Sequence, residues 1–301
     1  MHLYSNALGT FVLNQNFQIR EKELGKDSKD KFLKKFKNIK VIDENDIDSL
    51  RKALVLMREY KSDLIKKNTE IVKEDIKNSV KDDLFIVQTI NTIDDLNKVI
   101  NMLTKRLREW YSYYFPEASE FIPDNELFLK YVHMKKKDAM KEFGIKKSMG
   151  PDKEQSFVEP MQSLAKEIKS LYKQREEKEI YLGTLMDRIC PNVKAIAGTL
   201  IGAKLLSIAG SLRKLMLFPA STVQLLGAEE ALFKHIKTGA RCPKYGVLFA
   251  HQLVQKADKD RRGRAARVIA DKISLASKVD FFKGEFIGDK LLKEVEKKLA
   301  N

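Results

Sequence analysis

The basic segment from Lys256 to Arg267 is the part of this sequence whose residue types and spacing best suit a chemical task. It places a cationic loop, which includes Arg262, directly before a helical pattern. Arg264 and Arg267 are three residues apart, so they share one face of a helix. The guanidinium fork matches phosphate geometry, and the N–H groups at a helix start add to the attraction. The segment predicts binding of a phosphate-rich polyanion, with a merely solvated charged face as the alternative.

A second group of cations precedes this segment and contains one aromatic ring. Its members are Lys234, Lys237, Arg241, Lys244 and Tyr245. An exposed tyrosine here could stack on an unpaired base, whereas a buried one would belong to the core. The sequence leaves both possibilities open for this ring.

No sequence motif of an enzyme active site is present. There is no phosphate-binding loop, nucleophile elbow, zinc-protease motif or dinucleotide fingerprint. The histidines His2, His133, His235 and His251 are scattered, and Cys242 lacks an orienting acid. We therefore expect no catalytic residue, no metal site and no cofactor in this chain.

The charge balance indicates an anionic partner and places it in the last third of the chain. The 301 residues include 57 Lys and Arg against 42 Asp and Glu, a net charge of +15. Residues 191–301 hold 21 of these cations against 10 of the anions, whereas residues 1–190 hold 36 against 32. Nucleic acid is the partner that this field favours, ahead of an acidic membrane surface.

The sequence also predicts a reducing, cytoplasmic location. Only Cys190 and Cys242 are present, without metal-binding or redox spacing. The first residues lack the pattern of a signal peptide. The most apolar stretch, 195–212, contains Lys204 and is too short to span a bilayer. We attribute its Gly198 and Gly202 to close packing of helices in a soluble protein.

The elements that would position these residues begin with a small α/β module over residues 1–80. Strands are predicted at 3–8, 11–13 and 17–20, because apolar residues alternate around a turn at Asn14–Asn16. From residue 27 the spacing becomes helical, with Phe32 and Phe36 four residues apart.

Two long apolar stripes predict an antiparallel coiled-coil hairpin over residues 81–190. One runs from Ile86 through Trp110 to Tyr114, and the other has heptad spacing from Phe157 to Ile189. The segment 125–147 is expected to form the opposing helix, and the charged Arg175 in the seam indicates where the coil opens or meets another element. Core faces of a plain helical bundle are the alternative.

The remaining residues read as helices throughout. An all-helical domain is predicted over 191–285, with helices at 193–206 and 208–217, and a charged helix over 286–301. The expected fold class is mainly α: a small N-terminal α/β domain, a central antiparallel coiled-coil hairpin and an all-helical C-terminal domain.

Motifs along the chain resemble those of the Nop-domain family. Members of this family carry a GAEK–ALFR run, then PKYG and a basic helix. The corresponding residues here are Leu226–Lys234, Thr238–Ala240, Pro243–Gly246 and Arg264–Arg267, and upstream Leu84–Trp110, Phe115–Glu117 and Asp187–Val193. Within the family, the chain is most similar to the archaeal scaffold of box C/D small ribonucleoproteins, which guide RNA 2′-O-methylation.

The resemblance implies a non-enzymatic scaffold with three binding tasks. The N-terminal domain would hold the fibrillarin methyltransferase, and the coiled coil would form a dimer. The C-terminal Nop domain would bind box C/D guide RNA at a kink-turn already occupied by a small ribosomal-type protein. The RNA-binding residues would be Gly227, Lys234, Lys244, Arg262, Arg264 and Arg267, and the protein partner would contact Ala228, Glu229 and Glu230.

Two residues depart from the family pattern. Glu230 stands where Lys is frequent, so it would repel phosphate and is expected to face solvent or the protein partner. Lys234 stands where Arg is frequent, and it loses the bidentate fork. The chain also ends at Asn301 without the long charged tail of eukaryotic relatives, which favours an archaeal cell.

Three other functions are consistent with parts of the sequence. A splicing-type Nop protein would bind a similar RNA–protein pair without a methyltransferase, and the N-terminal strands argue against it. A nucleic-acid-processing enzyme would need an unrecognised site, and no acidic cluster supports one. A plain coiled-coil adaptor predicts no RNA binding, contrary to the C-terminal charge.

Overall fold

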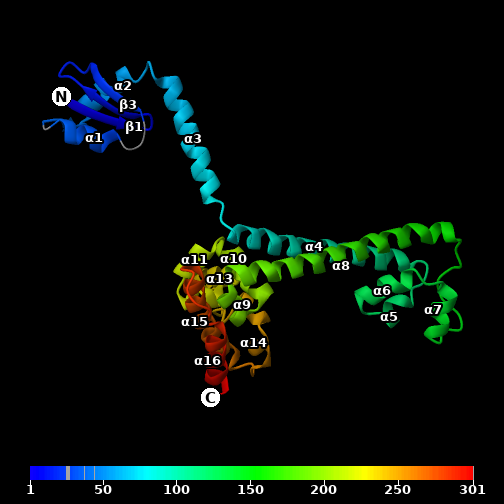
Figure 1. The fold of residues 1–301 in the computed structure, drawn as a ribbon. Helices are drawn as coiled ribbons and strands as arrows, with labels where there is room; N and C mark the ends of the chain where they lie inside the picture. The colour runs from blue at the N-terminus through cyan, green and yellow to red at the C-terminus, as the bar shows by residue number, and fades with distance from the viewer. Residues whose placement is uncertain (25–27, 37, 44, 301) are drawn as a thin grey trace. The chain divides into compact units, whose positions relative to one another are not determined.

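The computed structural model describes residues 1–24, 28–36, 38–43 and 45–300 (Figure 1). Its contacts divide the chain into two compact units, one ending at Lys81 and the other beginning at Asp82.

The N-terminal unit contains a four-stranded sheet with the order β3-β2-β1-β4. The strands are β1 His2–Asn6, β2 Gly9–Leu13, β3 Ile19–Leu24 and β4 Lys40–Val41. Strand β2 pairs antiparallel with β1 and β3, and β4 pairs parallel with β1. The Asn14 side chain accepts from the backbone N–H groups of Asn16 and Gln18, which fixes the predicted turn.

One helix packs on each face of this sheet. Phe11 and Leu13 of β2 contact Ala53 of α2 (Ile47–Leu56) on one face. On the other face, Val12 packs against Phe32 of α1 (Ser28–Lys35). Because successive strand residues point to opposite faces, the fully buried β2 serves both cores. A third helix, α3 (Lys61–Ser79), follows and has no buried residue.

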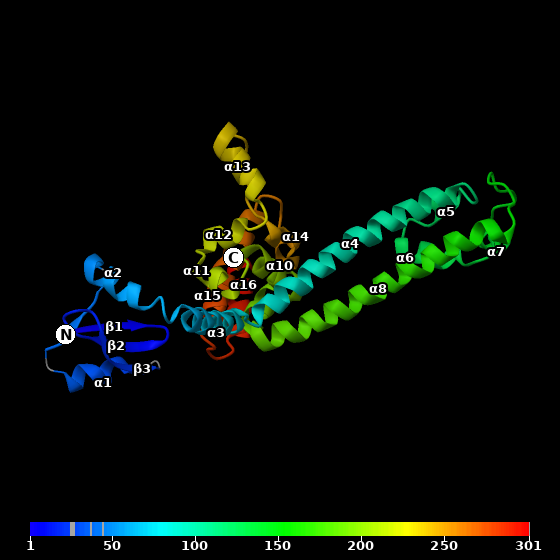
Figure 2. The ribbon, with the colours of Figure 1, turned by 90° about the horizontal axis from the view of Figure 1, so that it is seen from above.

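The second unit starts with a hairpin of two long helices. Helix α4 (Asp83–Ser112) and helix α8 (Gln155–Ile189) lie side by side in antiparallel directions (Figure 2). Both coincide closely with the two apolar stripes of the sequence. The predicted antiparallel hairpin is therefore confirmed, and its two helices are the stripes themselves.

The prediction that residues 125–147 form the opposing helix is wrong. These residues form two short helices, α6 (Asn125–Val132) and α7 (Lys136–Glu142), which follow α5 (Ala118–Phe121). They pack at the far end of the hairpin, where Arg108 lies 4.3 Å from the centre of the Phe128 ring. The continuous apolar face of α4 is the better partner for α8, because charged residues interrupt the 125–147 face.

The hairpin contains two separate cores joined by a polar middle. One core surrounds Tyr111, Phe128 and Ile168 at the far end, and the other surrounds Ile90 and Leu182 at the end near the C-terminal helices. Between them, Arg175 makes ion pairs with Glu126 of α6 and Glu179 of α8, 3.5 and 3.6 Å long. The charged seam residue Arg175 thus meets another element, as predicted.

The C-terminal helices pack around the 20-residue helix α15 (Arg262–Phe281). The other elements, in chain order, are α9 Pro191–Ala197, α10 Thr199–Ala209, α11 Leu212–Leu217, α12 Ala220–Leu225, α13 Glu229–Thr238, η1 Val247–Ala250, α14 Gln252–Lys256 and α16 Gly288–Ala300. Helix α13 has no buried residue and projects from the other helices (Figure 2).

A buried carboxylate connects α15 to the start of this domain. Asp280 accepts hydrogen bonds from the backbone N–H groups of Asn192 and Val193, at 3.1 and 2.9 Å. The Asn192 side chain in turn accepts from the backbone of Ile287. Burial raises the pKa of Asp280, although these N–H donors oppose the shift.

The helix predicted over 193–206 is in fact two helices. Gly198 has a φ of 77°, which ends α9, and α10 leaves at 116° to it. Only Gly202 serves close packing, since a Cβ atom there would lie 2.9 Å from Met186 Cε. No single described helix is long and apolar enough to cross a membrane, although α9 and α10 together reach that length and composition.

Candidate RNA and partner interface

Backbone hydrogen bonds bring the segment at residue 227 and the segment at residue 245 together. Val247 donates to the carbonyl oxygen of Leu226 at 2.8 Å, and Gly246 donates to that of Gln224 at 3.0 Å. The buried Gln224 side chain donates to the carbonyl oxygen of Lys244 at 2.6 Å. These bonds fix the base of the arm formed by α13 and the loop after it.

Two glycines allow this close approach. A Cβ atom on Gly246 would lie 1.9 Å from the Leu226 carbonyl oxygen. Gly227 has a φ of 84°, and a Cβ there would lie 2.6 Å from Val247 Cγ2. The sequence predicted that Gly227 allows RNA to approach the backbone closely. In the structure, the space that a side chain at Gly227 would need is occupied by Val247 of the same chain.

The residues expected to contact a protein partner lie at the start of α13. The carboxylate of Glu229 accepts from the backbone N–H of Gly227 at 2.7 Å, so it orders the turn into the helix. Glu230 is exposed and Ala228 is partly buried. Partner contact by these three residues stays a prediction.

Helix α13 also presents an apolar surface that the sequence analysis missed. Phe233 is 61% exposed and Ile236 is 69% exposed, and the two side chains are three residues apart. Lys234, a predicted RNA contact, is exposed beside them. Exposed apolar side chains on a projecting helix are typical of a binding surface. The sequence signal that could have revealed this surface is the spacing of Phe233 and Ile236, which places two large apolar side chains on one side of a helix that has no longer apolar stripe.

The fold places Lys244 against the start of α15. Gly263 has the Lys244 side chain beside it, since a Cβ on this glycine would lie 3.5 Å from Lys244 Cδ. Lys244 and Gly263 are 19 residues apart in the sequence but adjacent in the structure. The motif around Lys244 and the basic start of α15 therefore form one cationic face. This juxtaposition agrees with the idea that both motifs serve one anion.

The three predicted arginines of this face have different environments. Arg262 is partly buried, donates to the carbonyl oxygen of Ala257 at 3.2 Å and lies 5.7 Å from the centre of the Phe249 ring. Arg264 and Arg267 are exposed and make no ion pair with any residue in the described part of the chain. Arg264 and Arg267 are thus free for phosphate, while Arg262 organises the loop.

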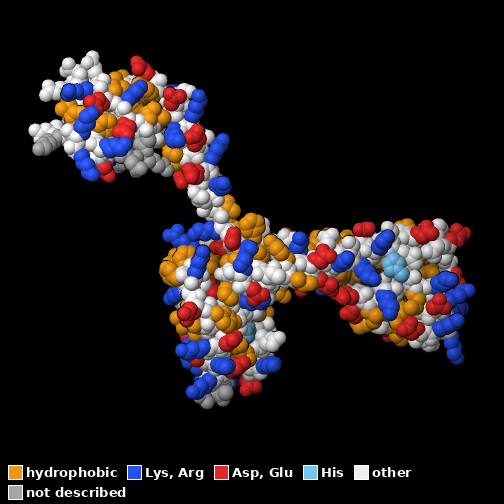
Figure 3. Space-filling model, viewed as in Figure 1, with side chains coloured by type: hydrophobic (Ala, Val, Ile, Leu, Met, Phe, Trp, Pro, Cys, Tyr) orange, Lys and Arg blue, Asp and Glu red, His pale blue; other side chains and the backbone are white. Residues whose placement is uncertain are grey.

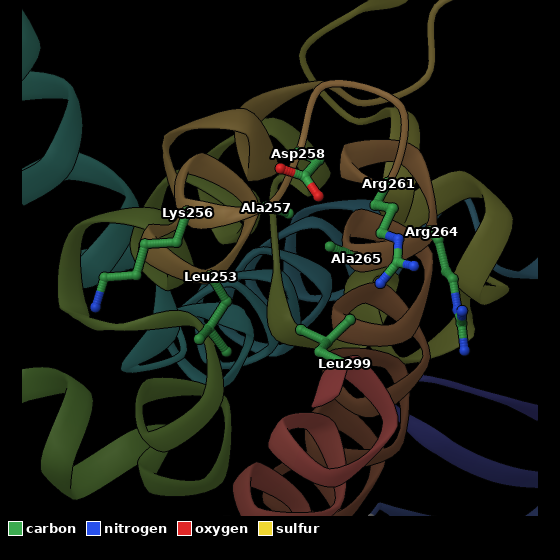
Figure 4. A pocket seen from close by; sticks show the side chains of 8 residues that line it. All are labelled: Leu253, Lys256, Ala257, Asp258, Arg261, Arg264, Ala265 and Leu299. Atoms are coloured by element: carbon green, nitrogen blue, oxygen red, sulfur yellow. The ribbon is translucent and has the colours of Figure 1, made fainter. Parts of the chain in front are cut away.

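Arg264 is one of the residues that line a cavity of about 280 Å³ (Figure 4). The walls of this cavity are apolar and its rim is mostly cationic. It is lined by Leu253, Lys256, Ala257, Asp258, Arg261, Arg264, Ala265 and Leu299. Lys256 and Arg261 add two cations to this face. Both lie in the basic segment from Lys256 to Arg267, but neither was among the RNA-binding residues predicted from the sequence.

Tyr245 is partly buried and packs against the protein core. Its ring stacks on Phe249 at a centroid distance of 5.0 Å with 15° between the planes, and it packs against the main core of the unit. The alternative left open by the sequence is therefore decided in favour of packing.

The described residues contain no group of three or more His, Cys, Asp and Glu side chains that could hold a metal ion. Cys242 is exposed, and its thiol lies 3.6 Å from the carbonyl oxygen of Pro243. His251 is buried, and its Nε2 is hydrogen-bonded to the carbonyl oxygen of Ile196 at 2.9 Å. The structure does not bring this pair together as a nucleophile and base.

Comparison with known proteins identifies the family of this chain. Residues 92–301 match the family described as Nop, "snoRNA binding domain, fibrillarin". The match covers more than half of the chain, which therefore belongs to the Nop family.

Individual relatives agree with this assignment. An uncharacterised NOP5 family protein of Methanocaldococcus jannaschii is 37% identical over 250 residues, covering 77% of this chain and 60% of that protein. Nucleolar protein 56 of Saccharomyces cerevisiae is 36% identical over 244 residues, covering 73% of this chain and 48% of that protein. The bovine nucleolar protein 56 is 35% identical, with 72% and 41% covered.

The chain thus spans about 40–60% of the length of the curated relatives that it matches. A solved structure entitled "Crystal structure of fibrillarin/Nop5p complex" aligns over 99% of this chain and 98% of that chain, with 21% identity and a TM-score of 0.48.

Proposed function

We propose that this chain is the scaffold subunit of a box C/D small ribonucleoprotein that guides 2′-O-methylation of RNA. In this particle the chain links fibrillarin, the methyltransferase, to a guide RNA whose kink-turn carries a small ribosomal-type protein. The chain itself supplies no catalytic group and no cofactor, and it acts in the cytoplasm of an archaeal cell. Membership of the Nop family supports this function.

The scaffold acts by position. Methyl transfer requires the donor carbon and the target 2′-oxygen to meet in a near-attack geometry, and holding both reactants replaces a rare encounter by a local one. Helix α8 has 35 residues, which corresponds to about 50 Å of rigid spacer. Such a helix can hold RNA and protein partners at a defined separation.

The cationic face at the start of α15 is the observation that carries the RNA-binding part. Lys244, Arg264 and Arg267 come from two separate motifs and converge on one helix end. Their charges are uncompensated by acidic side chains within the described residues, which favours a polyanion. Helix α13 begins next to the segment that contains Lys244, and its exposed Phe233 and Ile236 would contact the protein that occupies the kink-turn.

The N-terminal unit is the proposed fibrillarin-binding part. Its helix α2 exposes Ile47, Leu54 and Val55, although α2 also covers one face of the sheet. Ile47 lies about two turns before the adjacent residues Leu54 and Val55, so the three exposed side chains form one apolar side of the helix, as expected for a protein-binding face. A splicing-type Nop protein would have no use for this surface.

Self-association through the coiled coil completes the proposal. Ile180 of α8 is exposed between the two cores, and Met102 of α4 is exposed beside the far core. These side chains would be covered when a second copy packs against the hairpin. Sedimentation of the purified chain would show a dimer, and Ile180→Asp should convert it to a monomer if this surface is used.

The principal test is a mobility-shift experiment on a kink-turn RNA, with and without the small ribosomal-type protein. Tight binding only to the preformed RNA–protein complex is the expected result. A second experiment tests fibrillarin binding by the N-terminal unit. Fibrillarin should co-elute with the chain and with the control variant Leu33→Asp on α1, but not with Leu54→Asp on α2. Equal binding to every RNA, or no binding of fibrillarin, would contradict the scaffold function.

A further inference from the structure

An aromatic pocket at the far end of the hairpin lies outside the interface described above. Its volume is about 290 Å³. It is lined by Trp110, Tyr113, Tyr114, Lys153, Ser156, Phe157, Val158, Pro160 and Met161, which come from the end of α4, the start of α8 and the segment before α8. The sequence placed Trp110 and Phe157 in the apolar stripes of the predicted coiled coil, and both are exposed in the structure.

The exposure of these rings is unusual for a core stripe. Tyr113 is 77% exposed, Phe157 is 58% exposed and Trp110 is 38% exposed. Three large rings that open onto one cavity indicate a ligand surface rather than scattered surface residues. A cavity of this size is at the small end of ligand pockets, so it suits one planar ring system better than a peptide segment or a helix face.

The segment that precedes the lining residue Lys153 is held firmly. The carboxylate of Glu117 accepts from the backbone N–H of Met149 at 2.6 Å and from the hydroxyl of Ser148 at 2.9 Å. Partial burial alone would raise the pKa of Glu117, but these donors and the charge of Lys136 hold it below its ordinary value. A Cβ on Gly150 would lie 2.2 Å from the Tyr114 carbonyl oxygen, so the segment presses against the end of α4.

Cations back and border the pocket. The ammonium group of the buried Lys136 lies 5.0 Å from the centre of the Tyr114 ring and donates to the carbonyl oxygen of Gly150 at 2.8 Å. Lys153, a lining residue, has its ammonium group 5.4 Å from the centre of the Phe157 ring. The charge of Lys136 is balanced in part by Asp152, whose carboxylate lies 3.6 Å from its ammonium group. The ammonium group of Lys153 would attract an anionic ligand, and the rings would stack on its aromatic part.

The surface around the pocket has the same sign. Residues 133–154 contain seven Lys against four Asp and Glu. Of these lysines, Lys137, Lys141 and Lys146 are exposed and make no ion pair with any described residue. Figure 3 shows Lys and Arg side chains gathered at this end of the hairpin, around the position of α7 in Figure 1.

We propose that this pocket takes a base of single-stranded RNA, with the neighbouring lysines contacting its phosphates. Exposed rings interleaved with cations are the usual platform for unpaired bases, because every base has a face to stack and every nucleotide a phosphate. This second RNA site rests on the proposed function, since it would act on the RNA that the C-terminal face holds. From Phe157 to Ile189 the helix rises about 48 Å, so the two sites engage separate parts of the RNA.

Trp110 makes the test direct, because it is the only tryptophan in the chain. The full chain is titrated with single-stranded oligoadenylate of about eight nucleotides, a length within the range that stacking sites cover. Emission of Trp110 should be quenched, and the duplex form of the RNA should quench far less. Phe157→Ala and Tyr113→Ala should each weaken this binding about tenfold, which is about 1.4 kcal/mol.

Matched variants separate stacking from general damage. Tyr181→Ala removes an exposed ring of α8 outside the pocket and is the control for the two ring variants. Lys169→Gln removes an exposed cation of α8 outside the pocket and is the control for Lys153→Gln. Both controls should leave quenching unchanged. Because Phe157 and Tyr113 are exposed, their replacement should leave the melting temperature of the chain unchanged, which verifies that each variant folds.

Each outcome has a distinct meaning. Quenching that persists in the double variant Arg264→Ala and Arg267→Ala would support a second site. A mobility shift of RNA without any change in Trp110 emission would overturn this pocket and leave the C-terminal site intact. Emission that depends on protein concentration without RNA, and is lost in Phe157→Ala, would identify the pocket as a contact between two copies and would also overturn the proposal.

Discussion

Replacement of both exposed arginines of α15 by alanine is the perturbation that tests the cationic face most directly. Arg264 and Arg267 share one side of the helix, and neither makes an ion pair with a described residue. Each can therefore release about one counterion from RNA when it binds a phosphate. The double variant should lower RNA affinity without loss of folding, since neither side chain is buried.

The magnitude follows from the number of phosphates that the two arginines bind. Each bound phosphate contributes about 0.7 to 0.9 to the slope of log affinity against log salt. When two phosphates are no longer neutralised, the slope should become shallower by about 1.4 to 1.8. Affinity is measured by mobility shift of the kink-turn RNA–protein complex over a series of salt concentrations.

The matched control is the double variant Arg51→Ala and Arg58→Ala. Both arginines are exposed on or directly after α2 in the N-terminal unit, and their loss changes the net charge by the same amount. An equal change of slope in the two double variants would mean that net charge, and not the position of Arg264 and Arg267, governs binding. A slope that does not change in either would refute the assignment of this face to RNA.

The remaining predictions concern stability and pH. Arg262→Ala should lower the free energy of unfolding by about 1 to 2 kcal/mol, because a partly buried hydrogen bond and a ring contact are removed; its salt slope should change less than that of the exposed arginines. Gly246→Ala should destabilise the chain by more than about 3 kcal/mol in urea unfolding, since its Cβ would clash with the Leu226 backbone. By contrast, Gly183→Ala within α8, where the Cβ meets nothing within 4 Å, should stabilise it by about 0.5 to 1 kcal/mol. Glu117→Gln should lower the melting temperature at pH 7, because the depressed pKa of Glu117 stabilises the fold above its ordinary value of 4.5 and this stabilisation disappears as the pH falls below that value. A melting difference that is the same at pH 7 and at a pH of about 3.5 would contradict this pH dependence.

The helical part of the fold was predictable where a stripe is long and continuous. Helices α4 and α8 follow from apolar residues repeated over 30 and 35 residues, a signal that local exceptions do not erase. The predicted strand beginning at Phe17 was less accurate, since β3 begins at Ile19 and continues through the charged residues to Leu24. Pairing with β2 supports this strand, and its Glu21 and Glu23 make ion pairs with Lys35 and Lys31 of α1.

Elements set by a few local contacts could not be predicted from spacing. The helix break at Gly198 depends on one backbone angle, and the two-residue strand β4 exists only through pairing with β1. The exposure of Trp110 and Phe157 escaped the periodicity argument, because a stripe continues beyond the point where its packing partner ends.

The candidate site was predicted as separate motifs, and the structure adds their arrangement. Lys244, Arg264 and Arg267 were selected from their residue types, which is sufficient to recognise an anion-binding composition. That Lys244 lies beside Gly263 depends on the long-range bonds between residues 224–226 and 244–247, and no local pattern encodes them. The distinct role of Arg262 likewise depends on the neighbouring Phe249.

The projecting helix α13 has a thermodynamic consequence for assembly. With 10 residues and no buried side chain, it is shorter than the roughly 12 to 15 residues that an isolated helix needs to persist in water. The free chain should therefore show rapid amide hydrogen exchange along α13, and the exchange should slow when a partner covers Phe233 and Ile236. Part of the intrinsic binding energy would then be consumed in ordering this helix, so a partner that covers Phe233 and Ile236 should bind with a lower affinity than the same contacts would give on a preformed helix.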